Sequence, residues 1–170
     1  MNWHDFFTYD ADTGNLIWKR RDLRSFANER MGKVWNTRFA GNVAGGKHNC
    51  GYTHVSVNGN KKLAHIVIWE MHYGPVPDGK DLDHCDTVKT NNRIGNLRPC
   101  SNDQNAWNTG IRKMNKSGFK GVAPHKGAWV AQIRANGKNN YLGRFRSPEE
   151  AHAAYCEAAK EMHGQFARTA

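Results

Sequence analysis

Residues 64–108 read AHIVIWEMHYGPVPDGKDLDHCDTVKTNNRIGNLRPCSNDQNAWN, and this stretch decides the fold of the chain. Its apolar run over residues 65–73 predicts a short buried helix, ended by a Gly-Pro pair. Residues 81–85 and 97–100 are expected to form short strands around a polar loop. A serine N-cap predicts a further helix over about residues 102–109. The segment therefore predicts helix, strand, loop, strand and helix, in that order.

The same segment carries polar residues whose spacing suits metal-assisted hydrolysis. Asp83 and Asn105 supply a carboxylate and an amide oxygen, which are hard ligands for a divalent ion that keeps its waters, as Mg²⁺ prefers. A neutral His84 can take a proton from an attacking water, and Asn96 can orient its ring through the other nitrogen. Asn108 follows Asn105 by one helical turn. A single Asp-His pair is ordinarily a surface pair, and loop asparagines mostly form turns, so it is the joint spacing that favours a site.

The order of these residues resembles the HNH endonuclease motif in its phage homing-endonuclease form. The letters DH, NNRIGNLR and QNAWN stand in register with that motif over residues 64–108. The resemblance implies a ββα-metal (His-Me finger) nuclease core, with His84 as the general base and Asn96 as the residue that positions it. It also makes Asp83 and Asn105 the metal ligands. Because Asn105 stands where the family name has a histidine, we expect Mg²⁺, or Mn²⁺, rather than Zn²⁺.

Residues 117–170 predict a second, smaller domain of three strands and one helix. Apolar and polar side chains alternate over residues 129–134, which is typical of a half-buried strand. An Asn-Gly turn leads to a strand over residues 140–145, and residues 118–122 supply a third strand. Residues 147–150 read SPEE, which predicts a helix start with a serine cap, a first-turn proline and a capping box. The apolar stripe of this helix consists of Ala151, Ala154, Tyr155, Ala158 and Met162, and Gly164 is its expected stop.

This second segment is similar to the DNA-binding domain of plant APETALA and ethylene-response-factor proteins. The similarity lies in FKGV, the strand ending in QIR, YLG and the helix SPEEAHAAYCEAA. Members of that family lay their sheet in the major groove, so the resemblance makes Gln132 and Arg134, which strand alternation also puts on the polar face, the base contacts. Ala123 stands where plant members carry an arginine, so their sequence preference is not carried over. Other matched contact positions are Lys120, His125, Lys126 and Tyr141.

The charge distribution points to a polyanionic partner, with nucleic acid as the first expectation. The 170-residue chain carries a formal net charge of +10. Residues 59–110 are neutral, whereas residues 1–58, 111–116 and 117–170 carry +3, +3 and +4. A neutral centre rich in Asp and Asn, flanked by basic segments, suits a cation site that faces phosphates. The basic residues of the short middle segment, which we expect to contact backbone phosphates, are Arg112, Lys113 and Lys116.

The remaining sequence adds an N-terminal β region. Residues 6–10 and 15–20 flank a Gly-containing turn and predict a hairpin, and residues 41–65 predict further strands with an Asn-Gly turn. Residues 20–40 show no period, and we predict no structure there. Four scattered cysteines without a CxxC pair argue against a zinc knuckle or a disulfide framework and favour a reducing cytosol. No run of about 18 apolar residues exists, so no membrane span is expected.

These observations predict an α+β chain in three parts. Residues 1–110 hold the N-terminal β region and the nuclease core, residues 111–116 form a basic linker, and residues 117–170 read DNA. The expected function is a site-specific, divalent-metal-dependent endonuclease for double-stranded DNA, acting in the cytoplasm of a phage-infected bacterium and without a membrane partner. Two alternatives stay open: a non-catalytic DNA-binding regulator with a vestigial nuclease core, and an RNA-processing nuclease.

Overall fold

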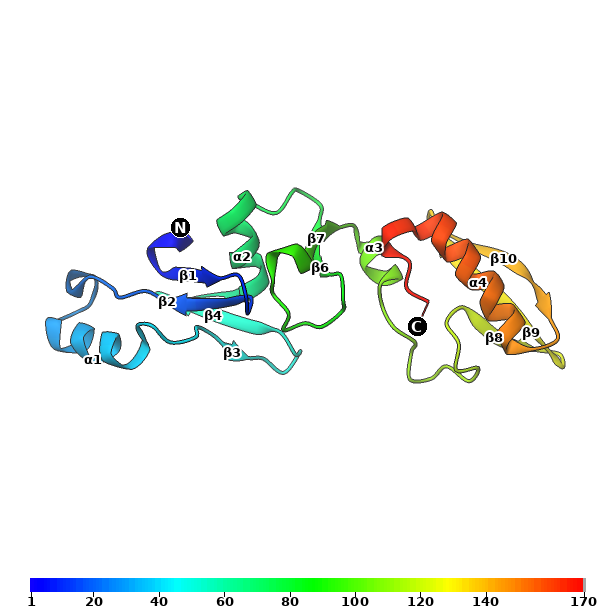
Figure 1. Cartoon of the computed structure of the whole chain (residues 1–170), viewed down its shortest axis with the longest axis horizontal. Coiled ribbons are helices and arrows are strands. Elements are labelled where there is room, and N and C mark those ends of the chain that lie inside the picture. The colour runs from blue at the N-terminus through cyan, green and yellow to red at the C-terminus, as the bar shows by residue number, and fades with distance from the viewer. Residues whose placement is uncertain (170) are drawn as a thin grey trace. The chain divides into compact units, whose positions relative to one another are not determined.

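The computed structural model describes residues 1–169 and divides the chain into two compact units. The first unit ends at Pro99 and the second begins at Cys100 (Figure 1). The strands form four small sheets and the helices pack on them, so the α+β class predicted from the sequence is confirmed. Among the described residues, no helix is long and apolar enough to cross a membrane.

The first unit begins with the predicted hairpin. Strand β1 (Phe7–Asp10) pairs with β2 (Asn15–Trp18), and the turn between them ends at Gly14, which has a φ of +75°. Phe7 and Leu16 are buried in the core of this unit. The hairpin therefore contributes apolar side chains to the core and presents its turn as a separate surface.

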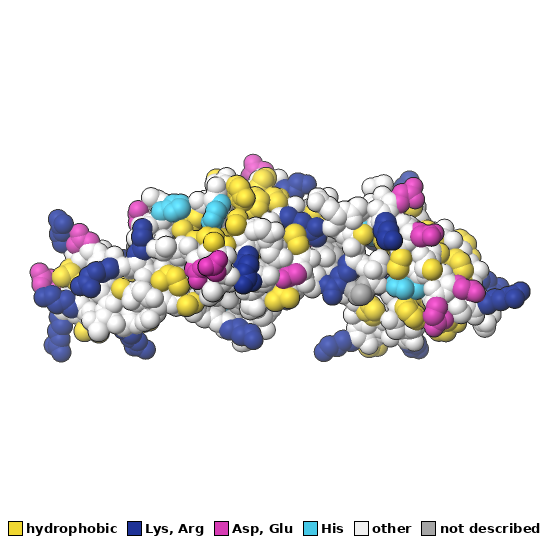
Figure 2. Space-filling view, viewed as in Figure 1, with side chains coloured by type: hydrophobic (Ala, Val, Ile, Leu, Met, Phe, Trp, Pro, Cys, Tyr) yellow, Lys and Arg dark blue, Asp and Glu magenta, His cyan; other side chains and the backbone are white. Residues whose placement is uncertain are grey.

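A helix occupies the region for which the sequence predicted no structure. Helix α1 (Glu29–Phe39) starts at Asn28, whose side chain accepts the N–H of Met31. Trp35 anchors the helix through edge-on contact with Trp18, with 5.2 Å between ring centroids. Basic side chains gather over the α1 end of this unit in Figure 2, and the exposed ones there are Arg24, Arg30, Lys33 and Arg38.

A three-stranded sheet and a buried helix complete the support of the site. Strands β3 (Gly46–Lys47), β4 (Thr53–Val57) and β5 (Asn60–Leu63) lie in that order, and β4 turns into β5 through the predicted Asn-Gly pair. Helix α2 (Ala64–Tyr73) follows at once and buries Val67 and Ile68 completely, as the apolar run predicts.

Two short strands carry the polar residues of the motif. Strand β6 (Asp81–His84) pairs with β7 (Leu97–Cys100), and a long loop with a 3-10 turn at Ile94–Asn96 joins them. The N–H of Cys85 donates to the carbonyl of Asn96 at 2.9 Å and closes the base of this loop. Both strands lie where the sequence predicts them.

The second unit begins with helix α3 (Asn102–Trp107), which is two residues shorter than predicted. Ser101 and Gln104 form a reciprocal capping box at its start. The helix stops early because the hydroxyl of Thr109 donates to the carbonyl of Ala106 at 2.7 Å and ends the helical pattern. The compact second unit therefore contains the last helix of the motif as well as the linker. The domain boundary at residues 111–116 stays a prediction.

The C-terminal sheet has the order β10-β9-β8, with β8 (Val122–His125), β9 (Ala128–Ala135) and β10 (Lys138–Phe145). The strand predicted over residues 118–122 lies a few residues later, because Gly121 has a φ of +73° and directs the chain into β8 only after that point. A Cβ built on Gly121 would lie 2.0 Å from the ring of Tyr155, so only glycine lets the chain pass this close to the helix.

Helix α4 (Pro148–His163) covers this sheet and differs from the sequence prediction in two details. Ser147 caps it as expected, but the carboxylate of Glu150 accepts from the N–H of Arg146 rather than closing a box on Ser147. Met162 is 40% exposed and is not part of the buried stripe. The helix is packed so that His163 is buried at the end of the stripe, and Gly164 ends the helix as predicted.

Candidate active site

Asp83 and His84 form the end of strand β6, and both side chains are buried, at 7% and 3% exposure. Arg98, on the paired strand β7, donates its Nε and Nη2 to the Oδ2 of Asp83 at 3.0 and 2.9 Å. A buried carboxylate needs such a partner, because desolvation of an unpaired charge is costly. Arg98 therefore holds the Asp83 carboxylate in a fixed orientation. The sequence alone assigns no role to Arg98.

The ring of His84 is held by the loop that follows it. Its Nε2 lies 2.9 Å from the Oδ1 of Asn92, which is also buried. An amide oxygen only accepts, so Nε2 carries the hydrogen and the lone pair of the neutral ring is on Nδ1. This geometry gives His84 the tautomer in which Nδ1 can act as a base.

Asn96 does not have the position predicted for it. Its amide oxygen accepts the N–H of Asp86, and its Nδ2 donates to the Oδ1 of Asp86 and the carbonyl of Asn91. The Asn96 amide thus joins the end of the loop to its earlier residues, Asp86 and Asn91. The side chain that bonds to the His84 ring is that of Asn92. The NN doublet at residues 91–92 is visible in the sequence, but only the loop conformation shows which asparagine reaches the ring.

Two rings of the first unit lie beside His84. His65 lies edge-on with 4.9 Å between centroids, and Tyr52 lies 5.9 Å away. Burial, with His84 and His54 nearby, lowers the pKa of His65 to about 4, so its ring is neutral at pH 7. The buried position of His65 favours a structural role over a contact with DNA.

The N-terminal hairpin supports the loop that carries Asn92. Arg93 donates its Nε to the carbonyl of Asp12 at 2.8 Å, and the N–H of Ile94 donates to the hydroxyl of Tyr9 at 2.8 Å. At Gly14 the two backbones come so close that a Cβ would lie 2.5 Å from the nitrogen of Arg93. The hairpin therefore fixes the position of the β6–β7 loop at the two residues that follow Asn92.

The residues predicted as metal ligands carry hard oxygen donors. Among residues 1–169, no group of three or more His, Cys, Asp or Glu side chains is arranged to hold a metal, as a zinc site would require. Asp83 is a fixed, anionic oxygen donor. Asn105 lies on α3 in the second unit, half-buried, and Asn108 is the buried C-cap residue of that helix. Carboxylate and amide oxygens are the donors that Mg²⁺ and Mn²⁺ take.

The C-terminal sheet presents most of the predicted DNA contacts to solvent. Gln132 and Arg134 alternate with buried Ala131 and Ile133 along β9, and Tyr141 of β10 pairs with Gln132. The other exposed members of the predicted set are His125, Lys126, Arg112, Lys113 and Lys116.

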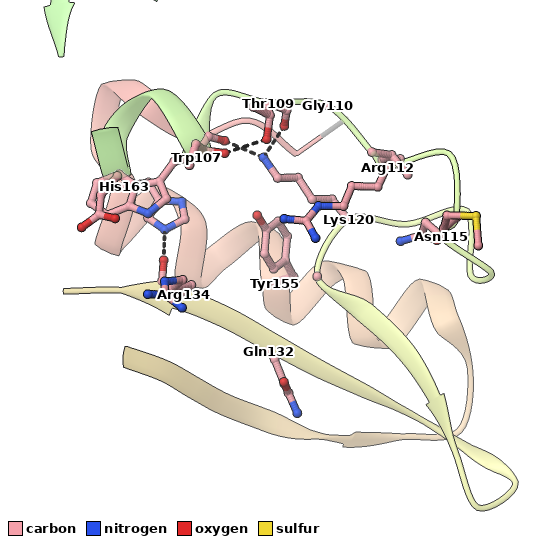
Figure 3. Close-up of a pocket in the computed structure, with 15 residues that line it drawn as sticks. Trp107, Thr109, Gly110, Arg112, Asn115, Lys120, Gln132, Arg134, Tyr155 and His163 are labelled. Atoms are coloured by element: carbon pink, nitrogen blue, oxygen red, sulfur yellow. Dashed lines mark hydrogen bonds between the residues drawn. The ribbon is translucent and has the colours of Figure 1, made fainter. Parts of the chain in front are cut away.

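Lys120 is the exception, because it is directed away from solvent. Its Nζ donates to the carbonyls of Trp107 and Thr109 at 2.5 and 2.7 Å (Figure 3). Burial, with Arg168 nearby, lowers its pKa to about 8, so the ammonium is still protonated at pH 7. The structure thus gives Lys120 protein partners in place of the DNA contact that the sequence predicts. The side chain lines a cavity of about 430 Å³ that lies wholly within the second unit.

Comparison with known proteins places the motif in a family context. Residues 62–107 match the family model described as HNH endonuclease. Protein 3.8 of Escherichia phage T7 is 37% identical over 106 residues, which cover 61% of this chain and 87% of that protein. Dehydration-responsive element-binding protein 2A of Arabidopsis thaliana is 44% identical over 57 residues, which cover 32% of this chain and 17% of that protein. A solved structure titled "DNA binding and cleavage by the HNH homing endonuclease I-HmuI" aligns over 90% of this chain and 76% of its own, with 17% identity and a TM-score of 0.39.

Proposed function

This chain belongs to the HNH endonuclease family, and from that premise we propose that it is a site-specific, divalent-metal-dependent endonuclease for double-stranded DNA. The observation that carries the proposal is the end of strand β6. There Arg98 holds the Asp83 carboxylate, and Asn92 holds His84 in the tautomer of a general base. The same reaction on a phage homing target, in the cytoplasm of an infected bacterium, is the biological setting that we propose.

Each residue of the site has a defined part in phosphodiester hydrolysis. His84 accepts the proton of the attacking water at Nδ1, while its Nε2–H keeps donating to the Oδ1 of Asn92. Asp83 and Asn105 are the proposed ligands of Mg²⁺ or Mn²⁺, on the strength of the family match that spans both. When bound, the ion supplies stabilisation of the charge that develops on the phosphate and the leaving 3′ oxygen. Arg98 keeps the Asp83 carboxylate in place for that ligand role.

We propose that the C-terminal domain reads the target sequence through the exposed face of β9. Support comes from the position of Gln132 and Arg134 on that face. A 57-residue similarity to a plant protein, whose name describes binding to a dehydration-responsive element, supports it as well. Tethering the nuclease core to such a reader raises the core's effective concentration at one site, so the core itself can be neutral.

The experiment that tests the function exposes a randomised duplex library to the protein, once with Mg²⁺ and once with EDTA, and sequences the new ends on each strand. We expect ends at one recurring motif with Mg²⁺ alone, and the two strands report whether the product is a nick or a break. Selective binding without new ends contradicts the nuclease and favours a DNA-binding regulator. Faster cutting of a matched RNA duplex contradicts the choice of DNA.

His84→Ala is the matched loss-of-base variant. Because it removes the proton acceptor and no DNA contact, cleavage should fall below detection while affinity for the target, measured in EDTA, changes by no more than a few-fold. Cutting by His84→Ala at the wild-type rate would assign the base to another residue.

Arg134→Ala tests the reading face. Loss of a side chain that reads a base edge should weaken specific binding by about 1–3 kcal/mol and relax the preference at one position of the motif. The measurement is a binding-site profile in EDTA, with Lys160→Ala, on the exposed surface of α4, as the control. An unchanged profile for Arg134→Ala refutes this face.

A further inference from the structure

The last helix of the nuclease motif is built into the C-terminal unit. Helix α3 carries Asn105 and falls within the family match, yet it clusters with the sheet and helix that follow it. At six residues, α3 is too short to be stable alone, since isolated helices below about 12 residues are marginal in water. Its conformation therefore depends on what it contacts in this unit.

Trp107, the last residue of α3, lies against His163 at the end of α4. The two rings stack with centroids 4.2 Å apart and planes 8° from parallel. His163 is itself fixed, because its Nε2 donates to the backbone carbonyl of Arg134 at 2.9 Å. Its Nδ1 is buried without a hydrogen-bond partner in the part of the chain described, which leaves the β9 backbone as the ring's polar anchor.

Lys120 fixes the same end of α3 from another direction. Its ammonium donates to two carbonyls: that of Trp107, one of the groups that a helix C-terminus leaves without an intrahelical partner, and that of Thr109, just past the C-cap (Figure 3). A cation at this end of a helix is also favoured by the helix dipole. Lys120 directly precedes Gly121, whose carbonyl accepts the N–H of Gln132 on β9. The contacts of α3 with His163 and with Lys120 thus both connect it to β9, the strand that carries Gln132 and Arg134.

We propose that Lys120 and His163 are positioning residues for Asn105, so that the strand that reads DNA also holds the helix that carries a metal ligand. This inference rests on the proposed role of Asn105. A displacement of β9 when it binds a base sequence is transmitted through His163 to Trp107 and through Lys120 to the end of α3. Binding of the target base sequence by β9 and placement of the Asn105 side chain are then coupled.

The test uses the full-length chain with Lys120→Met, His163→Gln and His163→Phe. Met keeps the stem of Lys120 without its ammonium, Gln keeps a donor for the Arg134 carbonyl without the ring, and Phe keeps the ring without the donor. Lys160→Met, an equal change of charge on the exposed surface of α4, is the control. Three quantities are measured: amide hydrogen exchange over residues 102–109, affinity for the target duplex in EDTA, and the Mg²⁺ concentration for half-maximal cleavage.

We expect Lys120→Met and His163→Gln to speed exchange over residues 102–109 about tenfold while β9 and β10 stay protected. The Mg²⁺ requirement should rise about tenfold, since residues that hold a ligand in place typically matter on that scale. Affinity in EDTA should stay within a few-fold, and Lys160→Met should match wild type. His163→Phe separates the ring stack from the bond to Arg134, because retained protection assigns the anchor to the stack.

Wild-type exchange over residues 102–109 in both Lys120→Met and His163→Gln overturns the proposal. If Lys120→Met also loses protection in β9, that variant has disturbed the sheet itself, and exchange over residues 102–109 in His163→Gln and His163→Phe then tests the proposal. Asn105→Ala keeps this outcome separate from the proposed function. If that variant cuts like wild type, the ligand assignment fails. Loss of cutting in Asn105→Ala together with unaltered exchange in the other variants removes only the link to the sheet.

Discussion

At the scale of the residue, the site is made of two neighbours that have different partners. Asp83 is held across the sheet by Arg98, and His84 is held along the chain by Asn92. Neither partner takes part in proton transfer itself. Arg98 restricts rotation of the carboxylate, and Asn92 selects one tautomer of the ring.

Asn92→Ala should therefore slow cleavage about 10- to 100-fold without changing DNA affinity in EDTA. The methyl group offers no acceptor for the Nε2–H of His84, so the ring loses the hydrogen bond that fixes its tautomer. Asn92→Asp keeps an acceptor at the same place and should recover part of the rate. Single-turnover cleavage of both variants is the measurement, and wild-type cutting by Asn92→Ala would show that the ring is oriented by something else.

The reacting residues were predictable from the sequence, but their supports were not. Asp83 and His84 stand out because of their spacing from later asparagines, which can be read directly from the sequence. The choice between Asn92 and Asn96 depends on how the polar loop closes. Asn96 is taken up in that closure, because its amide donates to the Asp86 carboxylate and the Asn91 carbonyl. Arg98 was missed because its partner is fifteen residues away on the paired strand.

At the scale of the element, the N-terminal hairpin acts on the site through its turn. The turn meets the loop between β6 and β7 at Gly14, where backbone faces backbone. Arg93 and Tyr9 add hydrogen bonds across the same contact. The loop is thus held from outside as well as by its own asparagines.

Gly14→Ala should lower the stability of the first unit by about 1–3 kcal/mol, because a Cβ at positive φ is strained and would meet the backbone of Arg93. The displaced loop should also slow cleavage. Thermal unfolding and cleavage rate are the measurements, with Gly41→Ala as the control, since Gly41 has a similar positive φ and no neighbour near its Cβ. Equal losses in the two variants would reduce the effect to backbone strain alone.

Elements with strong local signals were predictable, and those stabilised by distant contacts were not. Ser147 and the Asn-Gly turns specify their conformations within a few residues, so α4 and the hairpins follow from the sequence. Helix α1 has no such period, and it forms because Trp35 packs against Trp18 and Phe26. The prediction that Met162 belongs to the buried stripe of α4 was wrong, because the side chain that is buried at this end is His163, which stacks on Trp107.

At the scale of the whole molecule, the net charge of +10 is spread over exposed side chains in both units (Figure 2). The predicted phosphate contacts Arg112, Lys113 and Lys116 are exposed in the segment 111–116, and the ion pairs among residues 1–169 involve other basic side chains. Such charges release counterions when they meet DNA, so they raise affinity without reading sequence.

Lys116→Ala should lower affinity for all duplexes alike and reduce the slope of log K against log salt by about 1. The reason is that its exposed ammonium is proposed to neutralise one phosphate. Titrations of target and unrelated duplexes at several salt concentrations measure the slope, with Lys160→Ala as the control. A change in the preference between the two duplexes would mean that Lys116 reads bases.

The placement of α3 has a consequence for the ancestry of the chain. A recombination event that joined a nuclease gene to a reader gene within residues 111–116 would give α3 a C-terminal unit lacking matched contacts for Trp107 and Thr109. A crossover near Cys100 would instead split the nuclease motif itself. Neither junction leaves both halves whole, so an exchanged C-terminal unit would need matching contacts for Trp107 and Thr109 before it could hold α3 in the same way.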